Sequence, residues 1–198
     1  MKKLLLAILT LTAFTINAQS FKDSFDSNIM GWTEISLKKG EAVIKDGVMH
    51  MESKEAGQFI ETHCFSNLDV SKNFEIKCDA IAKKISEDGK FGIILDYIDD
   101  GNFIAFTIFV DENKNHYAWF QRYRDNKYVG GIMNKIKITD KRNANLSFSI
   151  KSTYQKLQFY VNNMLAIEAR YIPLTSNGFG FFVKGKQTVD FDNVEFIQ

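Results

Sequence analysis

The sequence has little proline, little cysteine and no convincing run of apolar residues at helical spacing. One proline and two cysteines occur among 198 residues. It also lacks a Gly-x-Ser-x-Gly elbow, a phosphate-binding loop and a Cys-x-x-Cys pair, and its three histidines, His50, His63 and His116, are too far apart for metal-ligand spacing. Acidic and basic residues nearly balance, so no excess of positive charge favours nucleic acid. The missing helical periodicity argues against a helical fold, and the missing motifs argue against the enzyme classes that use them.

The first residues have the layout of a cleavable secretory signal. Lys2 and Lys3 precede an apolar run at residues 4–14, and the small residue Ala18 follows before Gln19. The apolar run is too short to span a bilayer comfortably. We therefore expect residues 1–18 to be removed and residues 19–198 to form one secreted, periplasmic or cell-surface domain, with no membrane span. Without Lys2 and Lys3 the chain has 23 basic and 24 acidic residues, a formal charge near −1.

What the chain does contain is strand patterning, densest at residues 91–131. The run at residues 91–98 alternates Phe91, Ile93, Leu95 and Tyr97 with the intervening positions, and it is rich in β-branched and aromatic residues. A polar turn follows at residues 99–102, and the strand expected at residues 103–110 is apolar at nearly every position. A third strand follows a second polar turn. We expect a meander of three strands.

The remaining segments add strands separated by turn residues. Asp46-Gly47 predicts a hairpin between residues 42–45 and 48–51, and Asn162-Asn163 predicts another between residues 157–161 and 164–169. Further strands are expected at residues 59–64, 74–83, 146–151, 179–183 and 189–196, with an irregular crossing segment at residues 130–138. Turns recur about every ten residues, which predicts an all-β fold of two antiparallel sheets packed as a sandwich.

The order of these landmarks resembles the concanavalin A-like lectin/glucanase superfamily, in particular its secreted bacterial jelly-roll domains. The matching segments are FKDSFDSNIMGW, AVIKDGVMHM, NFEIKCDAIAK, FGIILDYIDDGNFIAFTIF, LQFYVNNMLAI and GFGFFVKGKQTVDFDNVEF. The resemblance implies two antiparallel sheets, one of them concave, with saccharide held on the concave face. Each segment is short and degenerate, so the resemblance is more specific for the fold than for the function.

Saccharide binding needs flat aromatic rings for stacking and polar side chains for the hydroxyl groups. If one set of strand faces points into the concave groove, it presents Tyr97, Tyr117, Trp119, Gln121 and Tyr123. If the opposite faces point there, Asp96, Arg122 and Arg124 supply polar groups at its rim. The alternative is that these rings belong to an ordinary sandwich core. We expect non-catalytic binding of a carbohydrate or cell-surface glycan as the function.

Two other functions stay open at this stage. The first is an enzyme similar to glycoside hydrolases of the laminarinase type or to 3-keto-disaccharide hydrolase-like domains. The nearest match to the laminarinase Glu-x-Asp-x-x-Glu pattern is Asp190, Asp192 and Glu195, which lies on the final strand and begins with Asp, so we interpret it as structural. The second is a surface module that binds protein or is purely structural.

A calcium site and a pairing of the two cysteines are also considered. The resemblance implies a structural calcium ion held by Asp23, Gly47 and Asp192, all donors of oxygen. The alternative is that Asp192 bonds backbone amides at a turn. Separately, a hairpin of residues 58–64 with residues 73–79 would place Cys64 opposite Cys78, either as a disulfide or as two small buried side chains.

Overall fold

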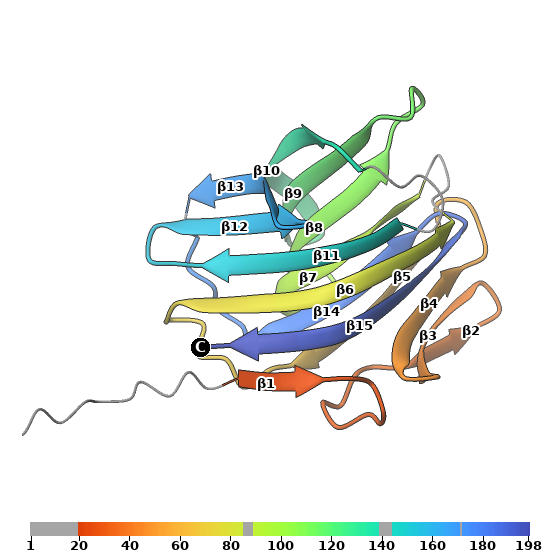
Figure 1. The fold of residues 1–198 in the computed structure, drawn as a ribbon, viewed down its shortest axis with the longest axis horizontal. Coiled ribbons are helices and arrows are strands. Elements are labelled where there is room, and N and C mark those ends of the chain that lie inside the picture. The colour runs from red at the N-terminus through yellow and green to blue at the C-terminus, as the bar shows by residue number, and fades with distance from the viewer. Residues whose placement is uncertain (1–19, 85–88, 139–143, 171) are drawn as a thin grey trace, which may run out of the picture.

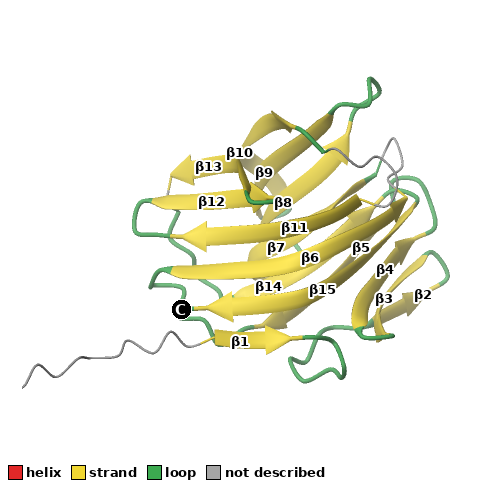
Figure 2. Cartoon of the chain, in the orientation of Figure 1, coloured by secondary structure: helices red, strands yellow, loops and turns green. Residues whose placement is uncertain are grey.

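The structure is a computed structural model that describes residues 20–84, 89–138, 144–170 and 172–198. The described residues form fifteen strands and no helix, arranged in two antiparallel sheets that pack face to face (Figures 1 and 2). The predicted all-β sandwich is therefore confirmed. No helix in these ranges is long and apolar enough to span a bilayer. The expected signal at residues 1–18 lies outside the described residues.

The larger sheet has nine strands and contains the two ends of the described chain. Its order is β13-β12-β11-β6-β15-β4-β3-β2, and β1 pairs with β15 beside this path. In chain order the strands are β1 (Ser20–Asp23), β2 (Ile35–Leu37), β3 (Gly40–Lys45), β4 (Val48–Ser53), β6 (Phe74–Lys84), β11 (Ala144–Ser152), β12 (Lys156–Val161), β13 (Met164–Arg170) and β15 (Gln187–Ile197).

The smaller sheet has six strands and lies behind the larger one in Figure 1, in the order β10-β9-β8-β7-β14-β5. Its strands are β5 (Phe59–Phe65), β7 (Lys90–Asp99), β8 (Asn102–Val110), β9 (His116–Arg124), β10 (Lys127–Ile136) and β14 (Gly178–Lys184). The predicted meander is confirmed as β7, β8 and β9. Four consecutive strands, β7 to β10, thus supply most of this sheet.

The hydrophobic core lies between the sheets and follows from period-2 alternation in the strands. Phe181 of β14 stacks on Phe191 of β15 with ring centroids 4.1 Å apart, and this contact joins one sheet to the other. Trp32 also stacks on Phe181, with ring centroids 5.3 Å apart. Its Nε1 donates a hydrogen bond to the Asp23 carboxylate. Phe25 and Trp32 are both buried.

Both predicted tight hairpins are confirmed. Lys45 pairs with Val48 across Asp46 and Gly47, whose φ values are 53° and 74°. Val161 pairs with Met164 across Asn162 and Asn163, whose φ values are 50° and 61°. Positive φ at both central residues is typical of the turn whose twist matches the flanking strands, which is why Asp-Gly and Asn-Asn were informative.

Two local predictions were wrong. The segment expected to be irregular is the regular edge strand β10, which pairs with β9 from Lys127 to Ile136 and has one register shift between Tyr128 and Gly130. Its glycines and exposed side chains hid the strand pattern. The expected hairpin of β5 with β6 does not form either, because β5 pairs with β14 in the small sheet and β6 pairs with β11 and β15 in the large one.

This separation of β5 from β6 also decides where the two cysteines lie. Cys64 belongs to the small sheet and Cys78 to the large sheet, and both are free, buried thiols in the core. The disulfide considered from the sequence is therefore not formed in this structure. The alternative interpretation, two small buried side chains, describes the observed arrangement.

Candidate functional site

The outer face of the six-stranded sheet gathers most of the aromatic side chains predicted to bind a ligand. On β9, Ala118 and Phe120 point into the core, so Trp119 and Gln121 point to the outer face. Tyr117, Tyr123 and Tyr97 share that outer face with them. Four of these five come from one strand, and Tyr97 comes from β7. We call the outward-facing side chains of this sheet the aromatic face.

The strand registers arrange the aromatic face in rows that cross the sheet. One row runs Glu61, Phe182, Gly92, Thr107, Trp119 and Met133 from β5 to β10. The next row runs His63, Gly180, Ile94, Ala105, Gln121 and Gly131. In the middle of the rows Gly92, Thr107, Gly180 and Ala105 are small and only Ile94 is larger, whereas Phe182 and Trp119 flank the middle of the first row. Large rings therefore border a lower central floor.

A groove of about 300 Å³ lies over this floor. The floor is an apolar cluster separate from the main core, formed by Ile94, Tyr97, Phe103, Ala105 and Phe182, with Tyr123 packed against it. The groove is lined by Phe59, Lys90, Asp100, Phe103, Ala105, Gln121, Tyr123, Asn126, Phe182 and Lys184. The hollow thus has both apolar rings and polar groups within reach of one ligand, as a saccharide site requires.

Gln121 is the polar centre of the face and is held in a fixed orientation. Its Oε1 accepts a hydrogen bond from the Thr107 hydroxyl at 2.9 Å, and its Nε2 donates to the Tyr123 hydroxyl at 2.8 Å. The side chain is only 7% exposed, and Phe103 stacks on Tyr123 with centroids 4.9 Å apart. Locked rotamers of this kind lower the entropy cost of binding.

A pair of carboxyl groups lies beside the groove, at Glu61 on β5 and Asp100 in the turn between β7 and β8. Burial, the charge of Asp100 and a hydrogen bond with Asp100 raise the pKa of Glu61 to about 7. Asp100 also accepts a hydrogen bond from the Tyr97 hydroxyl at 2.7 Å. His63 stacks on Tyr97 with centroids 4.0 Å apart, and burial lowers the pKa of that imidazole.

Sequence reasoning did not find this carboxyl pair. The alternation of β5 could have shown that Phe59, Glu61 and His63 share a face, because Ile60 and Cys64 between and beyond them are core residues. Its position beside Asp100, 39 residues later in the chain, depends on the pairing of β5 and β7 with β14. No local pattern carries that information.

The three charged residues considered for the rim occupy other environments. Asp96 is fully buried and has a φ of 54°, and its carboxylate accepts hydrogen bonds from the amides of Thr175 and Ser176 at 2.6 and 2.8 Å. Arg124 donates to the same carboxylate at 2.8 Å. Arg122 points to the face opposite Gln121, and its Nε is buried without a partner in the described structure. Asp96 and Arg124 fasten a loop.

The outer face of the nine-stranded sheet differs in chemistry. A hollow of about 440 Å³ lies there over β6, β11 and β15. Its charged groups pair with one another, including Lys151 with Glu75 at 3.6 Å and Lys77 with Glu195 at 4.0 Å. Tyr160 is the aromatic ring over which the Lys151 ammonium lies, at 5.3 Å. This face is polar and largely self-neutralised.

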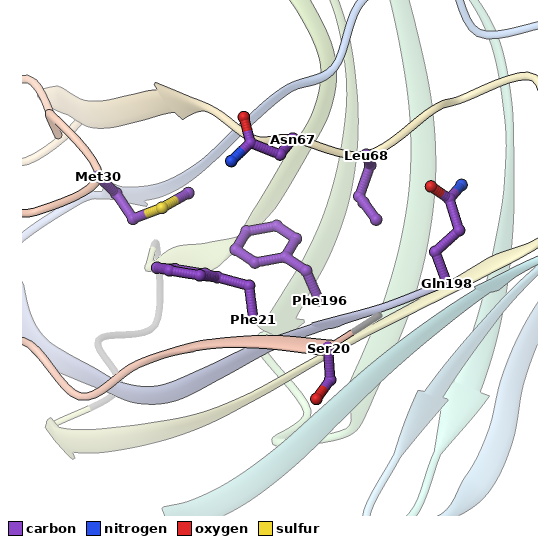
Figure 3. A pocket seen from close by; sticks show the side chains of 7 residues that line it. All are labelled: Ser20, Phe21, Met30, Asn67, Leu68, Phe196 and Gln198. Carbon is purple, nitrogen blue, oxygen red and sulfur yellow. The ribbon is translucent and has the colours of Figure 1, made fainter. Parts of the chain in front are cut away.

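A third cavity lies where the ends of the described chain meet and is small, at about 100 Å³. Figure 3 shows the rings of Phe21 and Phe196 lying close together, with Met30 and Leu68 approaching from different elements. This volume equals the share of roughly three water molecules in liquid water. The cavity is therefore much smaller than the groove on the aromatic face.

Of the three residues expected to hold calcium, Asp192 lies in the middle of β15, Asp23 lies on β1 beside it, and Gly47 lies in the turn between β3 and β4. Asp23 pairs with Val194, and both of its carboxylate oxygens accept hydrogen bonds, from the Phe25 amide at 2.9 Å and from Trp32 Nε1 at 2.8 Å. Asp192 accepts a hydrogen bond from the amide of Asn193 at 2.6 Å. These bonds give both carboxylates a structural role, and calcium binding together with the Gly47 carbonyl stays a prediction.

A different set of potential metal ligands lies on the outer face of the nine-stranded sheet. Glu41, His50 and Glu52 bring one ligand atom each within 4.8 Å of one another. The Nδ1 of His50 is 2.6 Å from the Asp190 carboxylate, which orients the ring. Lysines already neutralise this set, however: Lys45 lies 2.8 Å from Glu41. His50 is a structural member of a charge network.

Comparison with models of protein families and with curated proteins finds no match. Solved structures do match. A β-glucanase of Bacillus licheniformis is 11% identical with a TM-score of 0.63, covering 90% of this chain and 98% of that one. A legume lectin-like domain of Entamoeba histolytica is 14% identical with a TM-score of 0.61, covering 83% and 88%. The carbohydrate-binding module CBM66 of Bacillus subtilis is 14% identical with a TM-score of 0.54, covering 86% and 98%.

These likenesses show the fold: the chain has the same jelly-roll β-sandwich as these glucanase and lectin-like structures, which is the fold that the resemblance in the sequence implied. Binding modules, lectin-like domains and glucanases share this architecture, so the fold alone does not distinguish a binding protein from an enzyme. That distinction has to come from the side chains of the aromatic face.

Proposed function

We propose that the protein binds carbohydrate on the aromatic face and does not cleave it. The observation that supports this proposal is the groove lined by Tyr123 and the fixed amide of Gln121, with Trp119 beside it in contact with the groove residue Lys90. A pyranose ring stacks on an indole or phenol while the amide bonds a hydroxyl group. A signal at residues 1–18 would export the protein to where polysaccharides of the envelope and surroundings occur.

The arrangement of the acids favours binding over hydrolysis. Glycosidases hold two carboxyl groups about 5–5.5 Å apart to retain configuration, or about 6.5–9.5 Å apart to invert it. Glu61 and Asp100 interact with each other, which raises the pKa of Glu61, so they do not have the separation of either catalytic arrangement. Asp190 and Glu195 lie on β15 in the other sheet, and Asp190 is already paired with Lys83 at 2.6 Å.

The test is binding to a panel of neutral and acidic polysaccharides, measured by affinity electrophoresis and then by calorimetry. We expect Trp119→Ala to weaken binding about tenfold or more, because it removes a ring on which a sugar stacks. Tyr160→Ala is the matched control, since it removes a partly buried ring from the outer face of the other sheet. Equal losses in both variants, or no binding by the parent protein, would overturn the proposal.

The same panel tests the rival function. Release of reducing sugar by the parent protein, abolished in Glu61→Gln, would establish an enzyme and contradict the non-catalytic proposal. We expect no release above that of the Glu61→Gln variant.

A further inference from the structure

One row of the aromatic face carries lysines directly beside one another. In the strand registers Phe59 of β5 pairs with Lys184 of β14, Lys184 pairs with Lys90 of β7, and Lys90 pairs with Phe109 of β8. The same row continues through Tyr117 to Lys135 on β10. Two like charges directly opposite each other on neighbouring strands destabilise a sheet.

The ammonium of Lys90 is held over aromatic rings at the edge of the groove. Its Nζ lies 4.8 Å from the centroid of Trp119 and 5.0 Å from that of Phe109. Burial lowers the pKa of Lys90, and the charge of Lys184 lowers it further. Cation–π contact offsets part of this cost but does not neutralise the charge.

Within the part of the chain that the structure describes, no acidic side chain forms a salt bridge with this pair. Among the described residues, neither Lys90 nor Lys184 lies within salt-bridge distance of an acidic side chain, although eight other lysines do. Both residues line the groove, where Trp119 lies next to Lys90. The described residues thus place two adjacent cations, neither in a salt bridge with another described residue, where the proposed function puts a sugar.

We propose that the carbohydrate bound by the aromatic face is an acidic polysaccharide whose anionic group lies between Lys90 and Lys184. This inference rests on the proposed function and specifies its ligand class. A carboxylate or sulfate on a sugar ring would accept hydrogen bonds from both ammonium groups while the ring itself stacks on Trp119. The anion would also offset the repulsion between the two lysines. Relief of this repulsion would add to the free energy of binding.

The experiment compares polymers that differ only in charge. Polygalacturonate and its fully methyl-esterified form share one backbone, as do carrageenan and desulfated carrageenan. We expect the parent protein to bind at least one charged member about tenfold more tightly than its neutral partner, with an affinity that falls as salt rises. The first pair tests for a carboxylate and the second for a sulfate.

Charge-removing variants locate the contact. Lys90→Met with Lys184→Met keeps most of both aliphatic stems and should reduce binding of the charged polymer about tenfold more than it reduces binding of the neutral partner. Lys77→Met with Lys151→Met removes the same charge from the outer face of the other sheet and should leave both affinities unchanged. Melting curves check that each double variant is folded. We expect the Lys90→Met, Lys184→Met variant to be folded because it removes a repulsion between neighbouring strands.

The outcomes separate the two proposals. Equal affinity for charged and neutral members, or equal losses in the two double variants, overturns the acidic ligand but leaves carbohydrate binding standing. If neither charged nor neutral polymers bind and Trp119→Ala changes nothing, the proposed function itself fails, and this inference fails with it.

Discussion

Asp96 shows how one buried charge organises the end of the groove. It interrupts β7 in a left-handed conformation, between Leu95, which pairs with Ile104, and Asp99, which pairs with Asn102. Its carboxylate then bonds the backbone of Thr175 and the guanidinium of Arg124. A buried carboxylate is tolerable only when it is paired and hydrogen-bonded, and here both conditions are met.

Replacing Asp96 with Asn should therefore be costly although the two side chains have the same shape. Asn tolerates the positive φ, but it loses the negative charge that Arg124 and the two loop amides require. We expect a loss of about 3 kcal/mol in the free energy of unfolding, which lowers Tm by about 6–12 °C for a domain of this size. Chemical denaturation and thermal melts measure both quantities.

The matched control is Asp125→Asn, which also changes an aspartate of positive φ, in the exposed turn between β9 and β10. It should shift the free energy of unfolding by less than about 0.5 kcal/mol. Similar small shifts in both variants would show that the Asp96 network contributes little.

Among the strands, β5 is the one whose pairing partner could not be predicted from the sequence. As an edge strand it is joined to the sheet by β14, and its Glu61 is linked to the β7–β8 turn through Asp100. Because the fold keeps a proton on Glu61 that an unfolded chain would release, stability and pH are coupled through this strand.

The sign follows from the raised pKa. Glu61 has a pKa of about 7 in the folded chain, against an ordinary value near 4.5. Its contribution to stability is fully present below about pH 4.5 and is lost as pH rises through about 7. We expect Glu61→Gln to remove about 1–2 kcal/mol of this pH dependence, after discounting a full shift for solvent screening.

Denaturation curves at pH 5 and pH 8.5 measure the effect as a difference between parent and variant. Glu112→Gln, in the exposed turn between β8 and β9, removes the same charge as a control and should leave the slope with pH unchanged. If the parent protein loses no more stability than Glu61→Gln between pH 5 and pH 8.5, the raised pKa of Glu61 is contradicted.

The sequence predicted those elements whose geometry is local. Asp46-Gly47 and Asn162-Asn163 define their turns without help from the rest of the chain, and the period-2 pattern of β9 assigns Trp119 and Gln121 to one face. It failed at β10, where Gly130 and exposed polar residues dilute the pattern of an edge strand. It also failed where pairing is distant, since nothing near Cys64 shows that β5 joins β14.

The carboxyl pair and the lysine row depend on such distant pairings, so neither could be predicted from the chain alone. Lys90 and Lys184 are 94 positions apart, and only the register of β7 with β14 makes them neighbours. The aromatic residues were accessible to prediction because they are concentrated in one meander. The charges that would select a ligand come from across the sheet.

For the molecule as a whole, the two sheets enclose one core, and each sheet contributes one cysteine to it. Cys64 enters the core from the small sheet and Cys78 from the large one, and burial raises the pKa of both thiols. A thiol that is buried and protonated reacts only when the structure opens. In a sandwich with a shared core, opening sufficient to expose either thiol should separate the sheets.

We therefore expect both cysteines to react with a thiol reagent at one common rate under native conditions, equal to the rate of global unfolding. Unfolded protein that has not been reduced should titrate two thiols, in agreement with the free cysteines of the structure. Ser36→Cys, at an exposed position on β2, provides the fast-reacting control. Mass spectrometry of the labelled peptides measures each site. Faster labelling of Cys64 would mean that the small sheet opens alone, and fewer than two thiols would mean that the chain forms a disulfide after all.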